Sequence, residues 1–164
     1  MGIITIYLIF SMLAVIFFDV TRYIIPNWLV ASLLILYPVA VMMSPQVIDW
    51  KMALIAMAGV FAVGYIVFSM RWMGGGDIKL MTVCALWTGV SALADFIFIT
   101  AILGGLFAVS LWVARKWLPI YIKREKPWPR ILREGEPVPY GVAISITMLL
   151  LISGGKILAL GAGG

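Results

Sequence analysis

Long apolar runs with almost no charge inside them recur along the whole chain, and they limit its fold more than any other feature. Of the 164 residues, 64% are hydrophobic and 12% are charged, whereas soluble domains are roughly half apolar and a quarter charged. The core of a lipid bilayer offers no water to the backbone, so segments of this kind cross it as helices. The sequence therefore predicts an all-α, polytopic membrane protein with one domain over residues 1–164.

Six of these runs are predicted to cross the membrane. A straight crossing takes about 20 residues, and shorter helices are accommodated by local thinning of the bilayer. The predicted spans are 3–18, 28–43, 52–70, 78–90, 96–114 and 139–152. The first run has neither the basic start nor the small-residue cleavage site of a secretory signal, so we expect it to be retained as a span.

The basic residues orient these six spans. Ten of the twelve lysines and arginines fall in three loops: after the first span, between the third and fourth, and in the loop 115–138. Only Lys51 and Lys156 fall on the other side. The positive-inside rule makes the three loops cytoplasmic and both termini extracytoplasmic. We interpret the basic loop 115–138 as lying on anionic lipid headgroups, and we expect no nucleic-acid partner.

Residue types that are missing or rare exclude several kinds of catalysis. The chain has no histidine and a single cysteine, Cys84. Ser-His-Asp and Cys-His mechanisms are therefore impossible, and neither an internal disulfide nor a cysteine–histidine zinc site can form. Hydrolytic chemistry in this chain must use carboxylates, lysine, tyrosine or a bound metal.

Two aspartates are predicted to lie at the same membrane face. The chain crosses twice between Asp19 and Asp77, so both return to the cytoplasmic boundary, whereas Asp49 and Asp95 fall in extracytoplasmic turns. Two carboxylates that share a proton cannot both be ionised easily. The ionised one can then take a proton from water while the neutral one donates to a carbonyl oxygen. This arrangement needs no cofactor and no metal ion, and we expect neither.

Each aspartate also has a purely structural explanation. Asp19 ends a span and has Arg22 three residues later, a spacing that favours an ion pair. Asp77 precedes a span and is a possible N-cap. The three glycines at 74–76 favour a functional site, because they permit close backbone approach at an entropic cost that a plain turn rarely needs. Helix dipoles, worth about 1 kcal/mol, favour an ionised Asp77 as the base and a protonated Asp19.

Three segments together resemble the type IV prepilin peptidases, membrane aspartyl proteases named for a GxGD motif. "FDVTRYIIPN" is similar to the family's first-aspartate segment and contains Asp19, Arg22, Pro26 and Asn27. "GGGDIKL" is similar to the GxGD segment and contains Gly74, Gly76, Asp77 and Lys79. "PYGVAI" resembles the segment near the last helix and contains Pro139 and Gly141. One match would mean little, but three in order on six spans form a specific pattern.

The resemblance implies both an activity and its residues. Asp19 and Asp77 would be the catalytic pair, with Gly74 and Gly76 as the motif glycines. The substrate would be a prepilin whose short basic leader is removed at the cytoplasmic face of the inner membrane. The short chain is most similar to the peptidases of tight-adherence, or Flp-type, pilus systems. The larger members carry a cysteine-containing insertion and also methylate the new N-terminus; this chain lacks that insertion, so methyltransferase activity has no support.

Two other function classes fit the same features. Intramembrane carboxylates and glycine-interrupted helices also line the pathways of proton- or ion-coupled transporters. A non-catalytic scaffold for pilus assembly would share the peptidase fold. Both candidate aspartates are predicted at one face, with no charge at mid-span to continue an ion path, and this favours the peptidase.

Overall fold

The computed structural model describes residues 2–44, 47–121, 129–133 and 135–157. All regular elements in these residues are helical, which confirms the all-α prediction. In chain order they are α1 (Gly2–Arg22), α2 (Asn27–Met43), α3 (Trp50–Ser69), α4 (Gly75–Tyr121), the short 3-10 helix η1 (Arg130–Leu132) and α5 (Tyr140–Ser153).

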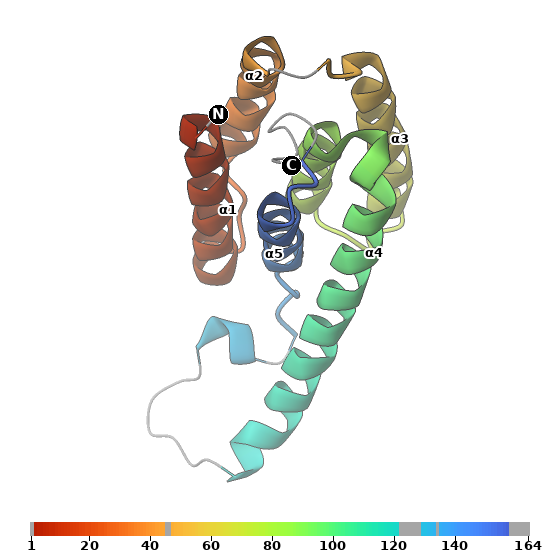
Figure 1. Ribbon diagram of the computed structural model, residues 1–164. Helices are drawn as coiled ribbons and strands as arrows, with labels where there is room; N and C mark the ends of the chain where they lie inside the picture. The colour runs from red at the N-terminus through yellow and green to blue at the C-terminus, as the bar shows by residue number, and fades with distance from the viewer. Residues whose placement is uncertain (1, 45–46, 122–128, 134, 158–164) are drawn as a thin grey trace.

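Helix α4 covers both the fourth and the fifth predicted spans and is broken at Gly89. This residue has φ 61° and ψ −176°, a combination almost confined to glycine. The two halves, 75–88 and 90–121, run in opposite directions on either side of the break (Figure 1). The second half continues beyond the predicted end at residue 114, because Arg115 and Lys116 end the apolar run without disfavouring a helix.

The predicted loop 115–138 is therefore partly helical. Residues 115–121 belong to α4, and η1 lies within the second part of the loop. Three of the basic residues assigned to it lie outside the described residues: Lys123, Arg124 and Lys126.

Successive helical segments run up and down through one bundle (Figure 1). The α1–α2 connection, the α3–α4 connection and the start of α5 lie at one end. The N-terminus, the α2–α3 connection and the break in α4 lie at the other end. Asp19 near the end of α1 and Asp77 near the start of α4 therefore share one end of the molecule.

The first half of α4 lies at the centre of the bundle, although it is the shortest predicted span. Its residues from Leu80 to Thr88 are almost all buried. The Trp87 indole N–H donates a hydrogen bond to the Leu33 carbonyl of α2 at 3.2 Å, and the Trp87 ring packs edge-on against Tyr37. Helix α5 lies between α1 and α4 and contacts both (Figure 1).

The described helices have the exterior of a membrane protein. Helices α1, α3 and α4 are long and apolar enough to cross a bilayer, and α2 and α5 are shorter apolar helices. Large apolar side chains are exposed all around the bundle, including Phe10, Ile35 and Phe98. An apolar surface of this extent suits contact with lipid.

Candidate active site

Asp19 is a buried carboxylate in the last turn of α1. The helix continues past the predicted span end at residue 18 and finishes at Arg22. The Asp19 side chain is only 5% exposed, and its Oδ2 atom has no hydrogen-bond partner among the described residues. Arg22 does not supply one, because its guanidinium lies 5.3 Å from the centre of the Phe18 ring. The burial of Asp19 is therefore not explained by a local ion pair.

Asp77 is the third residue of α4, three positions after the N-cap position considered for it above. Gly74 is the capping residue, and its carbonyl accepts a hydrogen bond from the Ile78 N–H at 3.2 Å. The Asp77 carboxylate turns back toward the Gly74 N–H, as in a capping box. A Cβ atom at position 74 would lie 3.0 Å from Asp77 Oδ2, so the glycine leaves room for this turn.

The N-terminus of α5 brings the two carboxylates together. The backbone N–H groups of Gly141 and Val142 face Asp19, and the Gly141 N–H also faces Asp77. The two carboxylates are close enough to interact electrostatically. A Cβ atom at position 141 would lie 2.6 Å from Asp19 Oδ2, so only glycine lets this backbone approach the pair. The aspartates thus meet around the start of α5, which separates α1 from α4.

The other residues of the three segments gather at the same end of the bundle. Lys79 Nζ donates a hydrogen bond to Asn27 Oδ1 at 3.2 Å and so joins the second segment to the first. Pro26 and Pro139 are the extended residues that precede α2 and α5. Gly76 is in van der Waals contact with Ile25, because a Cβ there would lie 3.5 Å from Ile25 Cβ. The structure therefore brings together residues that the sequence separates by more than a hundred positions.

Both aspartates line one cleft of about 1030 Å³. Its walls are the α1–α2 connection, the end of α3, the loop before α4 and residues 137–140 before α5. Tyr23 and Arg71 line it as well, and they are the non-glycine residues with positive φ in the described chain, at 57° and 60°. Strained backbone of this kind is concentrated at functional sites. The volume of the cleft leaves space for an extended peptide beside the two carboxylates.

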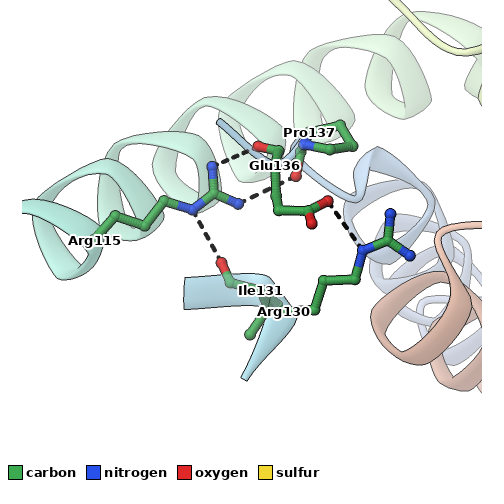
Figure 2. A network of polar contacts seen from close by, with 5 residues as sticks. All are labelled: Arg115, Arg130, Ile131, Glu136 and Pro137. Carbon is green, nitrogen blue, oxygen red and sulfur yellow. Dashed lines mark hydrogen bonds and ion pairs between the residues drawn. The ribbon is translucent and has the colours of Figure 1, made fainter. Parts of the chain in front are cut away.

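The segment after η1 is held over the cleft by an arginine network that the sequence reasoning missed. The Arg115 guanidinium donates to the carbonyls of Ile131, Glu136 and Pro137 at 3.0, 2.7 and 3.2 Å, as Figure 2 shows. Arg130 pairs with the Glu136 carboxylate at 3.0 Å. These basic residues were interpreted as contacts to lipid headgroups. Nothing in the sequence states which carbonyls an arginine will bind, so the network could not be predicted.

Tyr23 contacts this network and lines the cleft together with the aspartates. The Arg130 guanidinium lies 4.6 Å from the centre of the Tyr23 ring. Burial raises the pKa of the Tyr23 hydroxyl above its ordinary value, so the group stays protonated at neutral pH. Its oxygen is buried without a hydrogen-bond partner among the described residues. The only sequence signal for Tyr23 was its position inside the first-aspartate segment.

Asp49 and Asp95 have ordinary structural roles at the other end of the bundle. Asp49 caps α3 by accepting a hydrogen bond from the Met52 N–H at 3.1 Å. Asp95 pairs with Lys156 at 2.6 Å, and both side chains are about half exposed. Neither lines the cleft.

A comparison with protein families identifies the chain's relatives. The model of the type IV leader peptidase family matches residues 6–109, more than half of the chain. The matched region runs from α1 into the second half of α4, so it includes Asp19 and Asp77 and excludes α5. No match was found among curated proteins or among solved structures. The chain belongs to the type IV leader peptidase family.

Proposed function

We propose that this protein is a membrane-embedded aspartic endopeptidase that removes the short basic leader of a type IV, Flp-like prepilin. The observation that carries the proposal is the convergence of Asp19 and Asp77 on one cleft, where both face the Gly141 N–H. Membership of a leader peptidase family supports the reaction class. The described network of Arg115 and Arg130 accounts for part of the basic loop without a nucleic-acid partner.

The chemistry follows from two carboxylates that interact. One is ionised and takes a proton from a water molecule, which attacks the scissile carbonyl carbon. The other is protonated and donates its proton to the carbonyl oxygen. As the tetrahedral intermediate collapses, the first aspartate gives the proton it took from water to the leaving amine, and the second takes back a proton from the hydroxyl that becomes the new carboxyl group. Tyr23 lines the same cleft, and its hydroxyl is protonated. The reaction needs no metal ion and no histidine.

The structure changes the argument about which aspartate is the base. The dipoles of α1 and α4 alone favour charge on Asp77, as argued from the sequence. Asp19, however, also faces the N-terminal N–H groups of α5, which favour charge on Asp19. Both carboxylates thus lie at helix N-termini. We propose that they act as a pair that shares one proton, with no preference set by helix dipoles.

We propose that the cleft faces the cytoplasm of an inner membrane. In this orientation the six helical segments, counting the two halves of α4 separately, cross the bilayer and both termini are extracytoplasmic. Arg22, Arg71, Lys79 and Arg115 are at or near the cleft end, and Lys51 and Lys156 are at the other. This distribution agrees with the positive-inside rule. The apolar segment of the prepilin would enter from lipid while its leader stays in the cytoplasm.

The test is a cleavage assay in liposomes with a prepilin whose leader is released and weighed by mass spectrometry. We expect Asp19→Asn and Asp77→Asn each to lower the rate by about a thousandfold or more, because each removes a group needed in the transition state. The matched controls Asp49→Asn and Asp95→Asn lie outside the cleft and should cleave at the wild-type rate. A chelator should leave that rate unchanged.

The same liposomes separate the peptidase from its rivals. A transporter would move protons or ions across the vesicle wall without releasing a leader, and a scaffold would do neither. Substantial cleavage by either cleft variant, or inhibition by the chelator, would contradict the proposed chemistry.

A further inference from the structure

A second hollow of about 540 Å³ opens between α3 and both halves of α4, and we call it the α3–α4 groove. Every residue that lines it is apolar or glycine. Helix α3 contributes one face, from Ile55 to Val67, and the floor and far wall come from α4 on either side of its break at Gly89. The two helices lie side by side over this distance (Figure 1).

The α3–α4 groove lies next to the cleft that holds the aspartates. Met73 lines both hollows. Asp77 lines the cleft, and the next residue, Ile78, lines the groove. The two hollows are therefore neighbours along the start of α4.

The shape of the α3–α4 groove suits one side of a helix. Ile55 and Val67 are twelve positions apart, which is about 18 Å of helix at 1.5 Å per residue. Gly59 opens a notch in this wall: it is exposed, and no atom lies within 4 Å of an ideal Cβ placed on it. Rows of side chains on one helix pack into such grooves on another. In membranes, small residues mark the places where helices approach closely.

We propose that the α3–α4 groove binds the apolar helix of the substrate, on the C-terminal side of the bond that is cut. The inference rests on the proposed peptidase function and adds a second recognition site to it. A chain inside the bilayer must satisfy its own backbone hydrogen bonds, so the apolar part of the substrate is helical there. The position of the groove next to the cleft, with Met73 in the lining of both, favours a peptide that occupies both hollows over a lipid chain.

The test fills the notch and compares two substrates. One probe is a prepilin-like peptide with a basic leader and an apolar helix of about 20 residues; the other stops shortly after the scissile bond. Gly59→Leu should reduce cleavage of the long probe, relative to the short one, by about tenfold or more. The matched control Gly105→Leu, also an exposed helical glycine with open space around it but outside the groove, should leave the ratio unchanged. An unchanged ratio for Gly59→Leu would overturn the proposal.

A crosslinking arm separates failure of the groove from failure of the peptidase. A photo-reactive side chain placed at position 59 of the Asp77→Asn variant should capture the helix of the long probe, and the same group at position 105 should not. If the probe helix is captured at position 59 but the wild-type protein cleaves nothing, the groove proposal stands and the peptidase proposal is wrong. If the wild-type protein cleaves the probe but position 59 captures only lipid, the peptidase proposal stands and the groove proposal is wrong.

Discussion

At the scale of single residues, Gly141 is the tightest point of the site. Its N–H faces both aspartates, and its missing side chain leaves space for the Asp19 carboxylate. From the sequence, Gly141 is known only as a residue of the third segment, PYGVAI. The close approach that requires glycine appears only when α1 and α5 are packed together.

We predict that Gly141→Ala displaces Asp19 and slows cleavage. The added Cβ would lie 2.6 Å from Asp19 Oδ2 and 3.0 Å from Ile25 Cδ1, so the carboxylate must move. Misplacement of a catalytic group by about 1 Å costs on the order of a hundredfold in rate. The measurement is the rate of leader release in liposomes. Gly105→Ala, which adds the same atom in open space, is the control, and equal rates for the two variants would contradict the prediction.

Other site residues differ in how far the sequence revealed them. Asp19 and Asp77 became candidates because the number of predicted spans between them puts both at one face, and that number can be counted from the sequence alone. Tyr23 and Arg71 did not, because positive φ and burial depend on how the two connections fold over the cleft. As a possible N-cap, Asp77 was placed three positions too early in its helix, because Gly74 occupies the N-cap position.

At the scale of helices, the apolar runs predicted where the helices lie in the sequence. They did not predict which helices pack against one another. The breaks between the first four runs contain charges, proline or glycine, which end helices recognisably. Between the fourth and fifth runs the charge of Asp95 suggests a turn at 91–95. Asp95 instead lies within α4, and the chain turns at Gly89, which only the backbone conformation reveals. Helix α5 between α1 and α4 was not predicted either, because apolar periodicity in a membrane helix does not identify which helix it packs against.

The element that the sequence missed most completely is the segment anchored by Arg115. Three carbonyls between Ile131 and Pro137 accept hydrogen bonds from its guanidinium, directly before the extended residues that lead into α5 (Figure 2). The anchor therefore holds the entry of the helix whose N–H groups face the aspartates.

We predict that Arg115→Met loosens this entry and slows cleavage. Hydrogen bonds from a charged donor contribute about 1.5–3 kcal/mol each when buried, and less here because Arg115 is partly exposed. Hydrogen exchange should become faster at residues 138–142, and leader release slower. Lys116→Met removes the same charge from the next residue, whose ammonium lies over Trp112, and is the control. Equal rates of hydrogen exchange at residues 138–142 in the two variants would show that Arg115 does not hold this segment in place.

At the scale of the whole molecule, the two ends of the bundle differ in charge and in the side chains that gather there. The cleft and most basic residues of the described chain are at one end, and the Asp95–Lys156 pair is at the other. The prediction that Asp19 and Asp77 share an end came from counting crossings. It succeeded because the number of helices between them is even, whatever their packing.

We predict that a membrane-impermeant thiol reagent will distinguish the two ends in intact cells with the outer membrane opened. Cysteines are placed at positions 2 and 116 in a Cys84→Ala background; Cys84 itself is buried. Position 2 should react without permeabilising the inner membrane, and position 116 only after it. The reverse pattern would show that the protein has the opposite orientation, with the cleft on the side of the membrane away from a cytoplasmic leader.

The central claim is that Asp19 and Asp77 act as one catalytic unit, and a double-mutant comparison of cleavage rates tests it most directly. Groups that act together lose almost everything when either is removed, so effects on the rate do not multiply. We predict that Asp19→Asn, Asp77→Asn and the double variant release the leader at the same residual rate. Substantial cleavage by either single variant, or a double variant slower by the product of two independent losses, would contradict the account.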